Sequence, residues 1–125
     1  MFDQTLGFIV FTCAMSKSNR FNMTQKRNIV ITNNAFYNVH RNGKFFFSLI
    51  DNIYLLDIKR AIRYIDFAGL SKSAEPNNGE FIIHVEDDYD YHFPNTDVKL
   101  RDELFANLKA AYFMKRNKNL PIYKV

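Results

Sequence analysis

Cysteine is nearly absent from this chain, which has Cys13 and no second cysteine among its 125 residues. No disulfide can therefore form within the chain, and a reduced, intracellular setting fits this composition best. Cys13 stands in an apolar run, where a free cysteine usually behaves as a small buried hydrophobic residue. We accordingly expect Cys13 to be structural and not a reactive thiol.

Long apolar runs are also missing. The longest, residues 45–56, has 12 residues and contains Asp51 and Asn52, whereas a membrane-spanning helix needs about 20. The N-terminus carries Asp3 and no basic segment ahead of its first apolar stretch, which argues against a secretory signal. The sequence therefore predicts neither a transmembrane segment nor a signal peptide.

The motifs of common enzyme classes are lacking as well. The chain has no glycine-rich phosphate loop, no nucleophile elbow and no Cys and His spacing of a zinc site. Its three histidines, His40, His84 and His92, are dispersed. Acidic residues crowd positions 86–90, but this run lacks the spaced oxygen ligands and the glycine of a calcium loop, so a solvated acidic turn is favoured. We expect no catalytic activity, no cofactor and no metal.

What the chain does contain is enough apolar material for a core. It is 47% hydrophobic and 16% aromatic, which predicts one folded domain spanning residues 1–125. The net charge of +4 is unevenly distributed: residues 1–44 carry +5, residues 84–108 carry −5 and residues 109–125 carry +5. This asymmetry predicts a polar molecule with one face suited to anionic partners. For the C-terminal bases, an ordinary solvated surface is the preferred interpretation, because they also suit the end of a helix.

Short apolar or alternating runs bounded by turn residues predict β-strands through the first three quarters of the chain. Asn33-Asn34 predicts a hairpin turn, and Pro76-Asn-Asn-Gly79 predicts another turn. The strand-like runs cover residues 8–13, 28–32, 35–40, 45–49, 53–58, 61–67, 70–73, 80–85 and 89–93.

The periodicity changes after Pro94. Apolar residues then recur every four positions from Leu100 to Tyr112, which predicts an amphipathic helix of about four turns. Thr96 or Asp97 can cap its start, and we expect the apolar tail, residues 120–125, to fold back on the domain. Antiparallel strands followed by one helix predict an α+β fold. The pleckstrin-homology architecture has this order of elements, and we expect a pleckstrin-homology-like antiparallel β-barrel or sandwich capped by a C-terminal α-helix.

A basic run is the most informative positive feature. Lys17, Arg20, Lys26 and Arg27 fall within eleven positions at the mouth of the first predicted hairpin. Clustered Lys and Arg offer many hydrogen-bond donors to phosphate oxygens, so this run predicts a site for anionic groups. Phe21 and Met23 lie among these bases and either dip into a membrane interface or pack in the barrel.

The same run belongs to the first two of four segments in which the chain resembles the tail homology 1 domain of class I myosins, a pleckstrin-homology-like module. Residues 11–20 resemble the family's strand that ends in a Lys-x-Asn-Arg element, and residues 25–37 resemble its basic residue, apolar triplet, Thr, turn and Tyr. Residues 65–73 resemble its Leu-x-x-Ile-x-Gly-Ile-Ser-x-Ser element, and residues 78–85 resemble its Asp-Gly-x-Phe-Val-Leu-His-Val strand. The resemblance covers residues 8–125, which is nearly the whole chain.

The resemblance implies a non-catalytic module that binds anionic phospholipids, phosphoinositides included, at the cytoplasmic face of a membrane. It carries the lipid-binding role onto Lys17, Arg20, Lys26 and Arg27. A cytoplasmic, cytoskeletal or peripheral membrane location follows from it.

One departure from the family pattern supports an alternative function. Residues 43–54 look like an insertion where the family has a short turn, and the run 45–56 is more apolar than a surface loop should be. This insertion predicts a structural subunit of a larger protein assembly, with its interface at Phe45, Phe46, Phe47, Ile50 and Tyr54. Burial of the same run as an extra strand or helix remains open. Nucleic acid is a less favoured partner, because the acidic middle of the chain opposes it.

Overall fold

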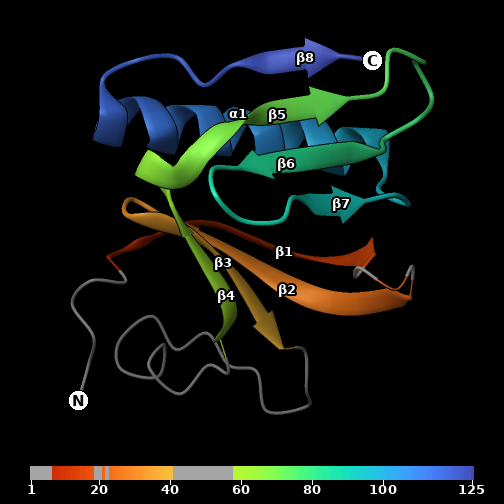
Figure 1. Cartoon of the computed structure of the whole chain (residues 1–125), viewed down its shortest axis with the longest axis horizontal. Coiled ribbons are helices and arrows are strands. Elements are labelled where there is room, and N and C mark those ends of the chain that lie inside the picture. Colours follow the sequence, from red (N-terminus) through yellow and green to blue (C-terminus); the bar gives the residue numbers. More distant parts are fainter. Residues whose placement is uncertain (1–6, 19–20, 22, 41–57) are drawn as a thin grey trace.

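The structure is a computed structural model of the chain that describes residues 7–18, 21, 23–40 and 58–125 (Figure 1). Its elements, in chain order, are β1 (Ile9–Ser18), β2 (Thr24–Thr32), β3 (Ala35–His40), β4 (Ile58–Arg63), the 3-10 helix η3 (Tyr64–Asp66), β5 (Phe67–Lys72), β6 (Phe81–Val85), β7 (Tyr91–Phe93), α1 (Val98–Arg116) and β8 (Ile122–Lys124).

The strands form two layers, with α1 lying behind β5 and β6 in the view of Figure 1. The hydrogen-bonded order is β4-β3-β2-β1-β7-β6-β5-β8. A single residue pair, Ser18 with His92, joins β1 to β7 and so connects the two layers. The predicted α+β fold, a barrel or sandwich capped by a C-terminal helix, is confirmed.

The core lies between the two layers and α1. Alternation along β2 turns Ile29 and Ile31 inward, and the four-residue repeat of α1 brings Leu104 and Leu108 against them. All four side chains are fully buried. Burying a side chain of this size stabilises the fold by about 1.5–3 kcal/mol, so this interior is the main source of stability.

The outer face of the first layer is also partly buried. Val30, Ala35, Tyr37 and Val39 alternate with the core-facing residues of β2 and β3, yet all four are buried in a second apolar cluster. This part of the sheet therefore has two apolar faces.

The run 61–67, predicted as one strand, is divided into three elements. It covers the end of β4, the 3-10 helix η3 and the first residue of β5. The buried Tyr64 hydroxyl donates a hydrogen bond to the Thr32 carbonyl at 2.7 Å, which holds the turn against the β2–β3 hairpin. The prediction of a continuous strand was wrong because this tertiary contact sets the bend.

The C-terminal tail folds back as predicted, but it pairs in parallel with β5 and not in the antiparallel sense. Gly69 permits the approach of this strand. Its φ is +152°, and a Cβ there would lie 3.0 Å from the Tyr123 ring and 3.2 Å from the Pro121 carbonyl oxygen. The neighbouring Leu70 N–H donates to that same carbonyl at 2.9 Å.

The other element boundaries differ modestly from the sequence predictions. The strand 35–40 is confirmed, β1 and β2 are longer than predicted, and the strand predicted at 89–93 is reduced to β7. Helix α1 has 19 residues, one turn more than predicted, and its N-cap is Asp97. The runs 45–49 and 53–57 lie outside the described residues. Within the described part of the chain, no helix has the length and apolar character to cross a membrane.

Candidate functional site

The predicted basic site falls on the end of the hairpin formed by β1 and β2. Lys17 lies in β1 and pairs with Gln25, next to Lys26 and Arg27 in β2. The strand register therefore brings the backbones of three of the four predicted bases to one end of the hairpin. Arg20 and the side chain of Lys17 lie outside what the structure describes.

Lys26 and Arg27 project to opposite faces of β2, because successive side chains of a strand alternate. Arg27 is half-buried and pairs with Met15, whose side chain belongs to the core. Lys26 is exposed and pairs with Ser16. The Nη1 of Arg27 donates a hydrogen bond to the Lys26 carbonyl at 3.0 Å. The side chains of Lys26 and Arg27 thus lie on different faces of the hairpin end.

Lys26 borders a cavity of about 250 Å³ between the hairpin and the start of α1. Thr96 and Asp97 form part of its wall. The Thr96 hydroxyl is buried and has no hydrogen-bond partner among the described residues. The Asp97 carboxylate accepts a hydrogen bond from the Leu100 N–H at 3.1 Å, so the helix start already has its own anion. Lys26 is the basic side chain among the described residues that line this cavity.

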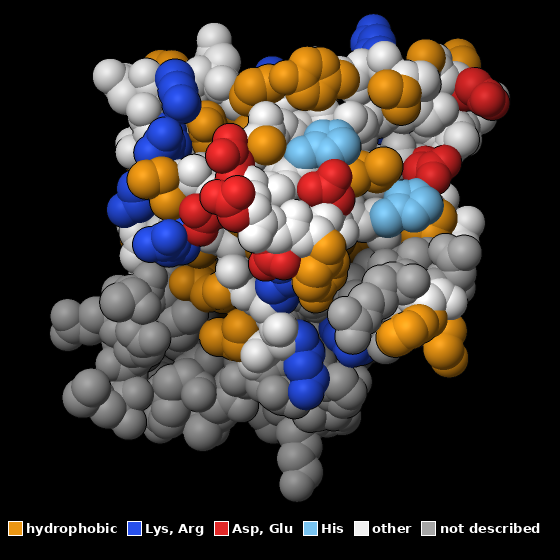
Figure 2. Space-filling model, viewed as in Figure 1, with side chains coloured by type: hydrophobic (Ala, Val, Ile, Leu, Met, Phe, Trp, Pro, Cys, Tyr) orange, Lys and Arg blue, Asp and Glu red, His pale blue; other side chains and the backbone are white. Residues whose placement is uncertain are grey.

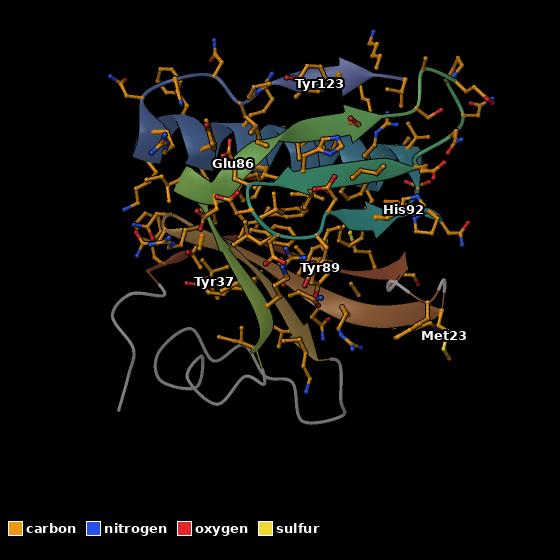
Figure 3. All side chains as sticks on the ribbon, viewed as in Figure 1. Met23, Tyr37, Glu86, Tyr89, His92 and Tyr123 are labelled. Carbon is orange, nitrogen blue, oxygen red and sulfur yellow. The ribbon has the colours of Figure 1, made fainter. Side chains whose placement is uncertain are left out.

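Two apolar side chains stand out from the same end of the molecule. Phe21 and Met23 are 71% and 64% exposed, and Figure 3 shows Met23 at the end of β2. Of the two interpretations of the sequence, exposure at an interface therefore fits better than packing inside the barrel. Exposed apolar groups beside bases are the combination that peripheral membrane proteins use.

The predicted partner interface, Phe45, Phe46, Phe47, Ile50 and Tyr54, lies outside the described residues. It stays a prediction.

The structure also contains a hydrogen-bonded chain that the sequence analysis missed. The Ser71 hydroxyl lies 2.5 Å from His84 Nε2, and His84 Nδ1 lies 2.7 Å from Asp90 Oδ2. The other oxygen of Asp90 accepts a hydrogen bond from the Val85 N–H at 3.0 Å. Ser71 and His84 come from neighbouring strands, so only the strand register brings them together. A second histidine, His92, pairs with Glu80, and Figure 2 shows histidines beside acidic side chains on this face.

This Ser–His–Asp chain does not have the surroundings of a hydrolase site. Ser71 is only 7% exposed, which restricts access of a substrate to its hydroxyl. Strand β5 is paired on both edges, with β6 and with β8, so the ladders use its backbone N–H groups. Acyl transfer needs such donors free to stabilise an oxyanion. The chain of hydrogen bonds therefore orders the surface of β5, β6 and the β6–β7 turn.

Asp90 is the titratable group that this arrangement perturbs. Its partial burial acts to raise its pKa, but the hydrogen bonds from Val85 and His84 and the charge of Arg60 outweigh that effect. The pKa of Asp90 is therefore lowered, and its ionised form is favoured in the folded protein.

The other reactive or charged groups considered in the sequence, Cys13 and the acidic turn, contribute to the structure. Burial raises the pKa of the Cys13 thiol to about 12, in keeping with a core role. In the acidic turn, Asp88 pairs with Arg60 at 3.1 Å. Among the described residues, no group of three or more His, Cys, Asp or Glu side chains is placed to hold a metal ion.

Comparisons with solved structures reveal the same fold. The carboxyl-terminal PH domain of pleckstrin is 17% identical with a TM-score of 0.63, and the match covers 85% of this chain and 99% of that one. The Slm1 PH domain in complex with inositol 4-phosphate is 13% identical with a TM-score of 0.62, covering 83% and 96% of the two chains. The structure of autoinhibited Vav1 is 11% identical with a TM-score of 0.62, and the match covers 90% of this chain but 19% of that one. At these identities the likeness shows the fold alone.

A search of curated protein sequences finds no match. The family described as "Unconventional myosin tail, actin- and lipid-binding" matches residues 5–123. Because that match spans nearly the whole sequence and the described barrel and helix have the pleckstrin-homology arrangement, the chain belongs to the unconventional myosin tail family.

Proposed function

We propose that this chain is a non-catalytic module that docks onto the headgroups of anionic phospholipids through Lys17, Arg20, Lys26 and Arg27. The family's description as lipid-binding supports this choice. The observation that carries it is the exposure of Lys26, Phe21 and Met23 together at one end of the β1–β2 hairpin. Such an arrangement places charges at the phosphates and apolar groups in the interface.

The expected affinity of one module is modest. Each Lys or Arg near an anionic surface contributes about 1 kcal/mol, so four bases supply a few kcal/mol. Binding of this strength is reversible and becomes firm when several modules act together. A peripheral membrane or cytoskeletal location follows from this function.

Liposome co-sedimentation tests the proposal. Vesicles of phosphatidylcholine alone are compared with vesicles that also contain phosphatidylserine or a phosphoinositide. We expect binding only to the anionic vesicles, weakening with salt. A Lys26→Ala, Arg27→Ala double variant should bind less.

The matched control is a Lys109→Ala, Lys118→Ala double variant, which removes the same charge from α1 and the segment after it, far along the chain from the hairpin. If both variants lose binding equally, net charge and not the hairpin is responsible. Absence of any binding to anionic vesicles contradicts the lipid function.

The alternative is a structural subunit of a cytoskeletal or other intracellular assembly, with residues 45–56 as the interface. The family's description as actin-binding favours a cytoskeletal setting. In this alternative the chain still acts as one domain over residues 1–125, with the apolar insertion presented to a protein partner.

A further inference from the structure

A large apolar groove lies at the end of the molecule away from the basic hairpin. Its volume is about 760 Å³, and it is bordered by β4, η3, the β2–β3 turn and the C-terminal end of α1. Tyr64, Ala35 and Tyr37 line it and are buried, so they form an apolar floor. A concave apolar surface of this volume is within the range of binding sites in proteins.

Basic side chains line the rim of this groove. Arg63, Lys115 and Arg116 border it, and Figure 2 shows Lys and Arg gathered along the left edge, where α1 ends. The exposed pair between Arg63 and Asp66, at 3.2 Å, offsets one of these charges. Lys115 and Arg116 form no ion pair with the described residues, and the buried Arg116 Nε has no hydrogen-bond partner among them. The rim therefore has unpaired positive charge and an unused donor.

An exposed apolar side chain stands at the edge of the groove. Ile65 lines the groove and is 56% exposed. Exposed apolar groups rimmed by polar groups are typical of protein interfaces, so a peptide segment that covers Ile65 fits this surface better than a small ligand enclosed in the groove.

The groove and the basic hairpin lie at opposite ends of the domain. Figure 3 shows Tyr37, which lines the groove, at the left, and Met23, at the end of β2, at the right. An occupant of the groove would therefore leave Lys26 accessible.

We propose that this groove binds an acidic, amphipathic segment of a partner protein, with apolar side chains over Tyr64 and Ala35 and carboxylates on Lys115 and Arg116. Guanidinium and ammonium groups pair well with carboxylates, and apolar anchors of an amphipathic helix fit a groove of this kind. This interaction goes beyond headgroup binding, because it uses a different surface and a different ligand chemistry. One domain can then connect an anionic membrane to an acidic protein.

Fluorescence anisotropy with a designed peptide tests the proposal. The probe is a fluorescein-labelled amphipathic peptide with leucines on one helical face and glutamates on the other. Two control peptides replace either the glutamates by glutamine or the leucines by serine. We expect the parent peptide to bind and both controls to bind more weakly, because charge and apolar contact are both needed.

Substitutions in the chain test whether the peptide binds at the groove. The Lys115→Glu, Arg116→Glu variant should weaken peptide binding by about tenfold, because each lost pair becomes a repulsion. An Ile65→Ser variant, changed at an exposed apolar position, should weaken it without altering charge. The Lys99→Glu, Lys109→Glu variant makes the same charge change at two exposed positions of α1 that do not line the groove, and it should bind the peptide as the parent chain does.

Several outcomes would overturn the proposal. One is peptide binding that survives charge reversal at Lys115 and Arg116, and another is binding that is lost equally in the Lys99→Glu, Lys109→Glu variant. If the chain does not bind the peptide but binds oleate at the groove, the proposed peptide is wrong and the occupant is a small anionic amphiphile. Liposome binding is measured on the same variants, so a failure of the groove proposal is distinguished from a failure of the lipid function.

Discussion

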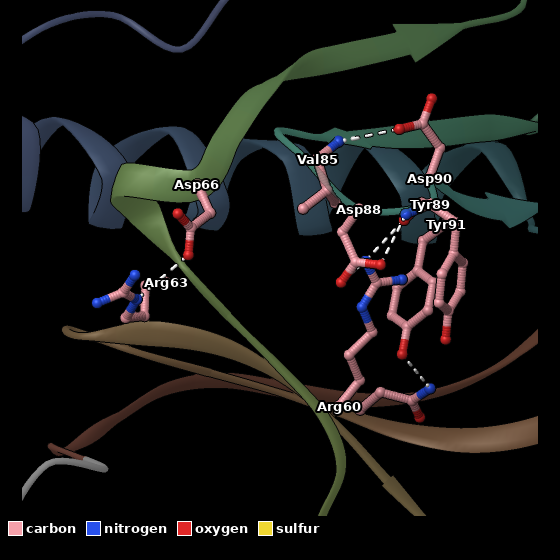
Figure 4. Close-up of polar contacts among 9 residues, drawn as sticks. Arg60, Arg63, Asp66, Val85, Asp88, Tyr89, Asp90 and Tyr91 are labelled. Atoms are coloured by element: carbon pink, nitrogen blue, oxygen red, sulfur yellow. Dashed lines mark hydrogen bonds and ion pairs between the residues drawn. The ribbon is translucent and has the colours of Figure 1, made fainter.

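The guanidinium of Arg60 lies 4.0 Å from the centre of the Tyr89 ring, and its Nη2 donates a hydrogen bond to the Tyr89 carbonyl at 2.6 Å (Figure 4). The same group lies 4.2 Å from the centre of the Tyr91 ring and pairs with Asp88 at 3.1 Å. Arg60 belongs to β4, at one edge of the first layer, whereas its partners belong to β7 and the β6–β7 turn. One side chain, only 9% exposed, thus connects the two layers away from the β1–β7 junction.

Replacing Arg60 by Ala should destabilise the fold by about 2 kcal/mol, because it removes two cation–π contacts, one hydrogen bond and one ion pair. Urea unfolding followed by circular dichroism measures this change. Arg63→Ala is the matched control, since Arg63 lies in the same strand but is exposed and forms a surface pair with Asp66. We expect the control to change stability by less than about 1 kcal/mol. Equal losses in both variants would show that the connection through Arg60 has no special role.

Asp90 should make the stability of the domain depend on pH in the acidic range. Its pKa is lowered in the folded state, so its contribution is present above the usual value of 3.8 and is lost as pH falls through the folded value. Asp90→Asn should therefore be less stable than the parent at neutral pH, by about 1 kcal/mol or less, since the carboxylate is largely exposed.

Urea unfolding at neutral pH and well below pH 3.8 checks this expectation. The difference between the parent and the Asn variant should shrink at the lower pH. If the difference in unfolding free energy is the same at both pH values, the hydrogen bonds of the side chain, and not its charge, stabilise the turn.

Local signals predicted those elements whose boundaries are fixed by local chemistry. Strand β3 was predicted at its observed bounds because Asn33-Asn34 marks its start by a turn and its apolar pattern is regular. Helix α1 was predicted because its four-residue repeat and its cap are both local in sequence. The break at η3 was missed because no Gly or Pro interrupts residues 61–67, and the Tyr64–Thr32 contact that bends the chain spans 32 positions.

The candidate site was predicted in part for the same reason. The sequence indicated one basic cluster ahead of the strand 28–32, whereas β2 extends through Lys26 and Arg27 and pairs there with β1. The two bases therefore lie on opposite faces, and this divergence was not predicted. Local sequence patterns could not predict the contact of Ser71 with His84, because it depends on the register between β5 and β6. The groove was missed because its walls come from four separate elements, and because the bases of residues 109–125 were interpreted as ordinary charges at the end of a helix.

The apolar triplet Phe45, Phe46 and Phe47 provides a test of the assembly alternative. Replacing all three by Ser should leave the isolated domain folded, with an unchanged unfolding midpoint, if these rings form an interface. The midpoint and the cooperativity of urea unfolding measure this. Loss of cooperative unfolding would instead place the rings in a core, where each lost aromatic side chain costs about 3–5 kcal/mol.

Single replacements of Lys26 and Arg27 should have different effects on lipid binding and stability, because the two side chains have different surroundings in the hairpin. Lys26 is exposed, so Lys26→Ala should weaken binding to phosphatidylserine vesicles and leave thermal stability unchanged. Arg27 is half-buried opposite Met15 and bonds to the Lys26 carbonyl, so Arg27→Ala should also lower stability, by about 1 kcal/mol.

Co-sedimentation and thermal unfolding of both single variants, side by side, measure the two effects. Lys109→Ala serves as the control, since it removes one exposed charge from α1 without touching the hairpin. A Lys26→Ala variant that binds anionic vesicles as well as the control would contradict the assignment of Lys26 to the lipid site. If that variant also unfolds at a lower temperature than the control, the ammonium has a structural contact, and the headgroup contact must be reassigned to the other bases of the hairpin.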